Sequence, residues 1–164
     1  MKILYLHILI IGLFLFSCTE RKDGFVQESK LYTGFEMTRE LNKKLEATIL
    51  AKNQILDSLK FSIKQLELQL NANKTDELFK QYELKKQEFL YKNQQFNEEN
   101  QQLQQTYTEQ SLIQINEYIN KYGEMNDYDY IYGANGNGSL MYAKDKNDIT
   151  EEVLVFINKK YQGK

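Results

Sequence analysis

Apolar residues recur at alternating steps of four and three residues through the first half of residues 30–122. The apolar positions of this series are Leu31, Phe35, Leu45, Ile49, Leu56, Leu59, Ile63, Leu66 and Leu70. The same steps also fall on Thr38, Asn42 and Lys52, so nine of the twelve positions are apolar. A sustained 3.5-residue repeat is typical of helices that wrap around each other in a left-handed supercoil. The pattern predicts one long helix to about residue 70, with Ser29 as its N-cap.

A polar segment at residues 71–76 interrupts the apolar pattern near the middle of the long stretch. Thr75 or Asp76 is placed to cap a second helix there, and Gly123 is placed to end it. Two helices of similar length then fold back on each other. We expect an antiparallel coiled-coil hairpin over residues 30–122, with an uninterrupted rod as the less favoured alternative.

The second helix of this hairpin has a sparse apolar seam. Its apolar positions, seven residues apart, are Tyr82, Phe89, Phe96 and Leu103, and the positions between them are Lys85, Lys92 and Glu99. Between residues 94 and 110, seven of seventeen residues are glutamine. Such a helix has too little apolar surface for a dry core along its whole length. We expect this part of the hairpin to be soft, with the seam strengthening again at Leu112 and Ile115.

The pattern of apolar residues changes after the helical hairpin, from a helical spacing to one that suits strands. Residues 128–132 are aromatic and β-branched and suit a strand, and residues 139–143 suit a second one. The residues between them are rich in glycine and asparagine, which favours a turn. The pattern predicts a β-hairpin over residues 127–143, with a further short strand around residues 25–27.

A final short helix is predicted over residues 149–161. Asp148 and Glu151 have the spacing of a capping box at its start. Apolar residues then mark one helical face, at Val153, Leu154, Phe156, Ile157 and Tyr161.

The amino terminus has the pattern of an export signal. Residues 3–16 are almost wholly apolar and would rise about 21 Å as a helix, which is short for a membrane core of roughly 30 Å. The segment ends in Leu15-Phe16-Ser17-Cys18, which resembles the lipobox of bacterial lipoproteins. This resemblance implies a signal at residues 1–17, lipid attachment at Cys18 and a tether at residues 18–24. An ordinary signal peptide with an incidental cysteine is the alternative.

Composition and motifs argue against catalysis. The absence of proline fits long uninterrupted helices. The net charge is −2, so nucleic acid, which is bound by basic surfaces, is not an expected partner. The only histidine, His7, lies in the signal, and the acidic pairs near residues 127 and 145 lack the other ligands of a calcium loop. We therefore expect no enzyme activity, no catalytic residue, no cofactor and no metal site.

The order of elements resembles the OmpH/Skp family of periplasmic chaperones. The residues that carry the resemblance are Phe25–Lys30, Tyr128–Tyr132, Ser139–Ala143 and Asp148–Val153. The fold class is then α+β and mostly helical, with one domain over residues 25–164 in which the long hairpin stands on a small β body. The strands expected to build this body lie around residues 25–27, 128–132 and 139–143. The resemblance implies a homotrimer, in which three hairpins surround a cavity that holds unfolded outer-membrane proteins without ATP.

The resemblance also implies roles for two sets of residues. The set expected to build the trimeric body is Phe25, Val26, Tyr128, Tyr130, Tyr132, Leu140 and Tyr142. The set expected to face the client protein is Phe89, Phe96, Leu103 and Tyr107. Ordinary packing in the hairpin seam is the alternative role for the second set.

Together these observations predict a holdase chaperone in the periplasm of a Gram-negative bacterium. It is anchored to the membrane through Cys18, with the outer membrane favoured over the inner one. The tether of about six residues spans at most roughly 20 Å, so we expect the β body near the membrane and the hairpins pointing away. The alternative is a structural coiled-coil lipoprotein that acts as a spacer or tether. The acidic pI of about 5.6 argues against the charge-steered binding of basic family members.

Overall fold

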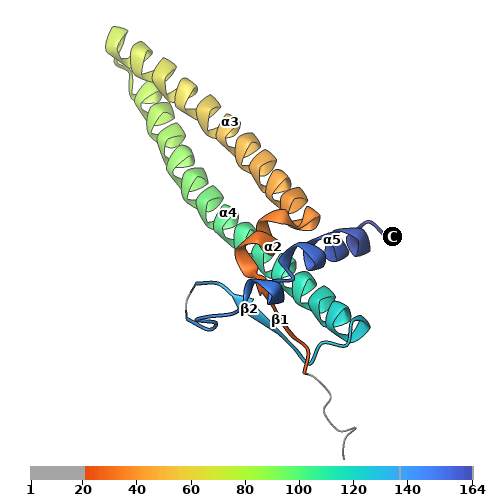
Figure 1. Cartoon of the computed structure of the whole chain (residues 1–164). Coiled ribbons are helices and arrows are strands. Elements are labelled where there is room, and N and C mark those ends of the chain that lie inside the picture. The colour runs from red at the N-terminus through yellow and green to blue at the C-terminus, as the bar shows by residue number, and fades with distance from the viewer. Residues whose placement is uncertain (1–20, 137, 164) are drawn as a thin grey trace, which may run out of the picture.

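The computed structural model of the chain describes residues 21–136 and 138–163. The elements are β1 (Asp23–Gln27), α2 (Glu28–Gly34), α3 (Glu36–Ala72), α4 (Asp76–Met125), β2 (Tyr130–Ala134), the 3-10 helix η2 (Asp145–Asn147) and α5 (Thr150–Tyr161). Helices α3 and α4 form a long hairpin, and the remaining elements gather at its open end as a base (Figure 1). The predicted α+β, mostly helical fold with a long hairpin is confirmed. The predicted signal and Cys18 lie outside the described residues.

The tip of the hairpin forms as the sequence predicts. Thr75 is the N-cap of α4, and its hydroxyl accepts a hydrogen bond of 3.3 Å from the Leu78 N–H. The C-terminal end of α4 differs from the prediction that Gly123 ends the helix. The helix continues through Gly123 and ends at Met125. The positive φ needed to leave the helix is taken by Asp127, at 55°.

The prediction of one continuous first helix is wrong, because the chain breaks helical geometry at Phe35. This residue has a ψ of 129° and is fully buried. The break leaves the Gly34 carbonyl and the Glu36 N–H without helical partners. The Asn158 side chain satisfies both: its Oδ1 accepts from Glu36 N at 2.8 Å, and its Nδ2 donates to the Gly34 oxygen at 3.2 Å. Burial of Phe35 and this bridge from α5 outweigh the helical propensity of the segment.

The prediction that Ser29 is the N-cap is also wrong. Helix α2 starts at Glu28, directly after strand β1, and Ser29 lies inside it. The strand fixes this boundary, because the N–H of its last residue, Gln27, donates to the Thr150 hydroxyl at 2.9 Å.

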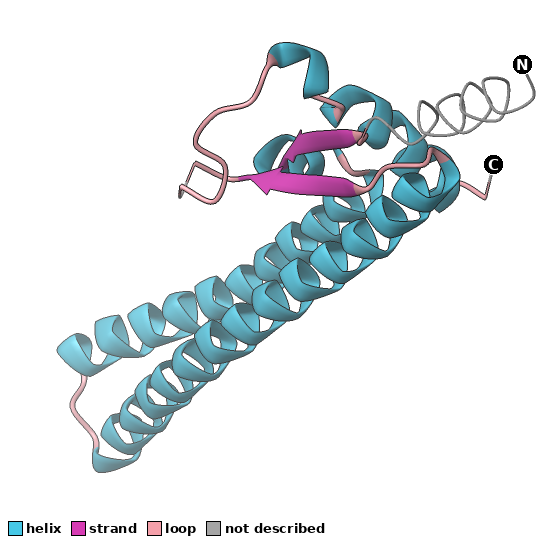
Figure 2. Cartoon of the chain, turned by 60° about the horizontal axis from the view of Figure 1, so that its bottom comes forward, coloured by secondary structure: helices cyan, strands magenta, loops and turns pink. Residues whose placement is uncertain are grey.

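The sheet is a parallel pair instead of a β-hairpin. Strand β1 pairs in parallel with β2, with Phe25 opposite Tyr132. Its other edge meets the start of α5, where the Ile149 N–H donates to the Phe25 carbonyl at 3.0 Å. The whole helical hairpin separates β1 from β2 in sequence, as a parallel connection requires. Both strands lie at the base end of the hairpin (Figure 2).

The predicted second strand at residues 139–143 does not form within the chain. Gly136 and Gly138 have φ values of 76° and 94°, and after them the chain does not return along β2. Leu140 and Tyr142 instead line a pocket together with Phe25. The prediction of a β-hairpin over residues 127–143 is therefore wrong in its pairing, although β2 itself is present.

The predicted capping box at the start of α5 is wrong, because the N-cap is Ile149 and has no side-chain cap hydrogen bond. The Asp148 carboxylate instead accepts from the N–H of Thr150 at 3.0 Å and from its hydroxyl. The Asp148 N–H donates to the Asp145 carbonyl at 2.9 Å in the 3-10 turn before α5, so it is not available to the Glu151 side chain.

The hydrophobic core lies in the base. Its buried members are Val26, Leu31, Phe35, Ile115, Ile149, Val153 and Ile157. They come from β1, α2, the break at Phe35, α4, the segment after η2 and α5, and Ile131 of β2 packs against them as a partly buried residue. Position 34, at the end of α2, favours glycine because α5 packs closely against it. A Cβ at Gly34 would lie 2.7 Å from Leu154 Cδ2.

Candidate functional site

Large apolar side chains are exposed along the half of the hairpin that is farther from the base. We call residues 50–92 the outer hairpin. Its exposed large apolar residues are Leu50, Ile55, Phe61, Leu68, Phe79, Leu84, Leu90 and Tyr91. Phe61 is 67% exposed and Tyr91 is 70% exposed. Exposed apolar surface can mark an interaction site, so these residues make the outer hairpin a candidate interaction surface.

Three shallow grooves run beside these side chains. One of about 340 Å³ crosses the two helices and includes Ile63, Tyr82, Phe89 and Leu90. A second of about 500 Å³ includes Leu66 and Leu84, and a third of about 420 Å³ lies at the tip and includes Leu70 and Phe79. Grooves of this kind suit loose contacts with an extended chain, since none encloses a small molecule.

Lysine side chains frame the aromatic rings of the outer hairpin. Lys60 Nζ lies 5.8 Å from the centre of the Phe89 ring, and Lys86 Nζ lies 5.6 Å from that of Tyr82. The outer hairpin has eight lysines against six acidic residues, whereas residues 93–125 have one lysine and five glutamates. The apolar surface of the outer hairpin is therefore slightly basic, although the whole chain is acidic.

Two acidic residues of the outer hairpin form ion pairs with its lysines. The hydrogen bond from Lys85, at 2.8 Å, lowers the pKa of Glu88 despite the opposing effect of desolvation. Lys64 pairs with Glu67 at 2.9 Å. These are exposed pairs within one helix and contribute little to stability, so the lysine groups remain accessible to a second binding partner.

The residues predicted to face the client lie mainly in the seam. Phe89, Phe96, Leu103 and Tyr107 are all half-buried, and Lys52 Nζ lies 5.3 Å from the Phe96 ring centre. Their placement agrees with the packing alternative. The more exposed apolar residues belong to faces that the seam analysis left aside. The spacing of Phe61 and Leu68, seven residues apart and off the seam, was the signal that could have found them.

The seam has a polar layer at Lys52. Its Nζ forms an ion pair with Glu99 at 2.8 Å and a hydrogen bond with Asn100 at 3.1 Å. The bonds from Lys52 and Gln95 lower the pKa of Glu99. This layer fixes the register of α3 against α4 where the apolar seam is weak. In the same seam Leu41 is buried in place of Asn42, and Ser111 in place of Leu112.

The residues predicted to build a trimeric body fall into two groups. Val26 is buried and Tyr128 packs against the same core, so both serve the chain's own fold. The others lie on the opposite side of the sheet or on the segment beside it, namely Phe25, Tyr130, Tyr132, Leu140 and Tyr142. We call this second group the outer sheet face. Tyr142 is 80% exposed and the rings of Tyr130 and Tyr132 stack with centres 5.9 Å apart.

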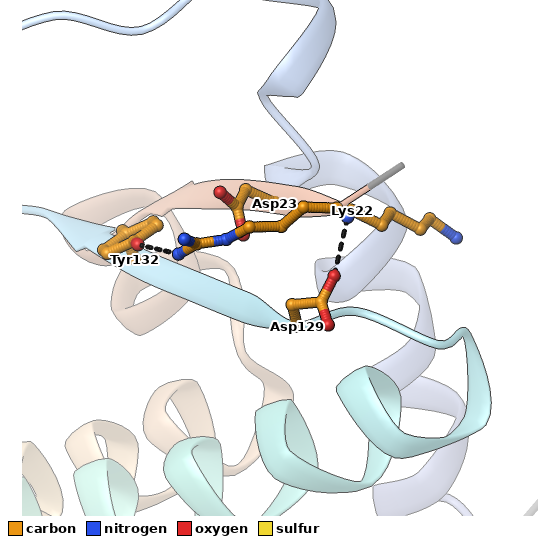
Figure 3. A network of polar contacts seen from close by, with 5 residues as sticks. Lys22, Asp23, Asp129 and Tyr132 are labelled. Carbon is orange, nitrogen blue, oxygen red and sulfur yellow. Dashed lines mark hydrogen bonds and ion pairs between the residues drawn. The ribbon is translucent and has the colours of Figure 1, made fainter. Parts of the chain in front are cut away.

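The first described residues are fixed to the base. The Lys22 N–H donates to Asp129 Oδ2 at 2.8 Å (Figure 3), and the Asp129 N–H donates to the Lys22 carbonyl at 2.8 Å. Arg21 lies 4.3 Å from the Tyr130 ring centre and donates to the Tyr132 hydroxyl at 3.1 Å. The folded domain therefore begins before residue 25, and the predicted tether at residues 18–24 is too long.

The described residues contain no group of three or more His, Cys, Asp or Glu side chains arranged to hold a metal ion. Among the same residues, no helix is both long enough and apolar enough to cross a membrane.

The fold and the exposed surface define a class of protein in which a long helical hairpin, apolar along its outer half, projects from a small α+β base. The sequence model of the family described as outer membrane protein (OmpH-like) matches residues 22–156, and the chain belongs to this family. Members are periplasmic chaperones of outer-membrane proteins in Gram-negative bacteria and are not enzymes. No curated protein matches the chain.

Proposed function

We propose that this protein is an ATP-independent holdase that keeps unfolded outer-membrane proteins soluble while anchored to the cell envelope by a lipid on Cys18. The observation that carries the proposal is the exposed apolar surface of the outer hairpin. An unfolded chain offers apolar side chains in an extended, changing arrangement. Shallow grooves with apolar floors and lysine rims can contact such a chain at many points without fixing one conformation.

The placement of the exposed residues refines where the client binds. Phe61, Leu68, Phe79 and Leu90 are exposed without being needed for the seam, so they can contact a client at no cost to the hairpin. Phe89, Phe96, Leu103 and Tyr107 are half-buried, and of these Phe89 lines one of the grooves.

The outer sheet face supports self-association, with a homotrimer as the expected assembly. A two-stranded sheet is marginal by itself, and β2 is paired only with β1 among the described residues. An open strand edge beside exposed Tyr132 and Tyr142 favours pairing with another copy of the chain. Residues 139–143, which have strand-forming composition but no strand within the chain, are placed to take part.

The test of the proposal uses the mature chain without its lipid, starting at Thr19. An outer-membrane protein diluted from urea is followed by light scattering with and without this chain. The expected result is suppressed scattering at near-stoichiometric amounts, and a trimeric mass by light scattering of the purified chain. Unchanged client aggregation would favour the alternative, a structural spacer lipoprotein, and a monomeric mass would contradict the trimer.

A further inference from the structure

The segment between Cys18 and the first residue that is fixed to the base is shorter than the predicted tether at residues 18–24. Lys22 is held by two backbone bonds to Asp129, and its Nζ donates to the Asn126 carbonyl at 2.6 Å and lies 4.2 Å from the Tyr128 ring centre. Arg21 is held by Asp23 at 2.9 Å as well as by its tyrosine contacts. Only Thr19 and Glu20 separate these fixed residues from Cys18.

This spacing limits how far the base can stand from an acylated Cys18. Consecutive Cα atoms are about 3.8 Å apart, so the Cα atoms of Cys18 and Arg21 can be separated by at most roughly 11 Å. The polar headgroup layer on one side of a bilayer is about 5–7 Å thick. An acyl chain inserted in the membrane would therefore hold the start of β1 at, or just above, the headgroups.

The direction of β1 determines which surface meets the membrane. Its first residues lie beside residues 125–129, the turn between α4 and β2, through the bonds of Lys22. We call residues 125–129 the base turn. The tip of the hairpin lies at the opposite end of the molecule (Figure 1), and the 37 residues of α3 extend for about 55 Å.

We propose that the base turn is a membrane-contacting surface, whose partner is the phospholipid headgroup layer that holds the lipid anchor. The inference rests on the proposed lipidation of Cys18. Met125 is 65% exposed and presents a flexible apolar side chain there, while Lys22 holds the turn to the tether. The outer hairpin then points away from the bilayer, and its grooves stay clear of lipid.

The protein contains no tryptophan, so single tryptophans can report contact with lipid. The full-length lipoprotein is prepared as Met125→Trp and, as the matched control, as Phe79→Trp at the exposed hairpin tip. Both are reconstituted in vesicles of phosphatidylethanolamine and phosphatidylglycerol that contain brominated phosphatidylethanolamine. We expect marked quenching of the tryptophan at position 125 and no quenching at position 79.

A third variant combines Met125→Trp with a Gly/Ser insertion of roughly twelve residues between Thr19 and Glu20. Quenching at position 125 is expected to fall, because the base is released from the surface while the anchor remains. If the protein floats with the vesicles but position 125 is no more quenched than position 79, the inference is wrong and the anchor stands. If mass spectrometry finds no acyl chain on Cys18, the anchor and the inference both fail.

Discussion

The base and the outer hairpin use apolar residues in opposite ways. In the base, apolar side chains from several segments are buried together, and polar groups left by the helix break are bonded to specific partners. In the outer hairpin, only a narrow seam is covered, and eight large apolar residues remain exposed. The exposed residues of the outer hairpin are not needed for its seam, whereas the buried residues of the base hold its elements together. The difference separates the buried core that specifies the structure from the exposed surface that is available for binding.

The largest expected difference in the free energy of unfolding is between a substitution of a core phenylalanine and a substitution of an exposed one. Phe35→Ala removes a fully buried ring that meets Tyr118 and Tyr161 edge-on at 6.1 and 5.5 Å. It should lower the free energy of unfolding by about 3–5 kcal/mol. Phe61→Ala on the outer hairpin should change it by less than about 0.5 kcal/mol. Urea denaturation of both variants measures the contrast, and equal losses would contradict the division of the molecule.

Asn158→Ala tests the polar bridge that supports the helix break. It leaves the part-buried Glu36 N–H and Gly34 carbonyl without their side-chain partners. A fully buried unsatisfied group costs about 1–3 kcal/mol, and water can reach part-buried ones, so we expect a total loss of about 1–3 kcal/mol in the free energy of unfolding. The matched control is Asn120→Ala on the exposed side of α4, which should have no measurable effect. Urea denaturation of both variants measures the difference. Equal denaturation midpoints would mean that Asn158 does not support the helix break at Phe35.

Asp148 gives the stability of the base a pH dependence. Burial alone would raise the pKa of Asp148, but hydrogen bonds from Thr150 and Gln27, with the charge of Lys30, lower it. Its stabilising effect is thus present above the unfolded pKa of about 4 and is lost as the pH falls through the lower folded value. Asp148→Asn should be less stable at pH 7 and approach the parent at acidic pH. Urea midpoints from pH 7 to about pH 2.5 measure this, and a constant difference would contradict it.

The local elements of this chain follow from its sequence more directly than their long-range pairing does. The 3.5-residue repeat located α3 and α4, and Thr75 capped α4 as expected. The break at Phe35 was missed, because nothing in residues 30–40 forbids a helix. It depends on Asn158, more than a hundred residues away. The parallel pairing of β1 with β2 was missed for the same reason, since the glycine-rich turn favoured a local hairpin.

The sequence predicted client-facing residues on the helical hairpin, and that assignment stays a prediction. Seam periodicity selected Phe89 and Phe96 because they were isolated among polar residues, and the structure places both half-buried. Phe61 and Phe79 lie off the repeat and are more exposed. An apolar residue off a coiled-coil seam has no packing partner in the hairpin. Those positions were therefore the stronger evidence for a binding surface.

The central claim is that the exposed apolar residues of the outer hairpin hold the client. The measurement is suppression of outer-membrane protein aggregation by a variant with Phe61, Leu68, Phe79 and Leu90 all changed to Ser. Its matched control has four exposed apolar residues outside the outer hairpin changed to Ser, namely Leu112, Ile113, Met125 and Val155. We predict that the first variant loses most of its holdase activity while its Tm stays close to that of the control, which remains active. Equal activity in the two variants would contradict the claim.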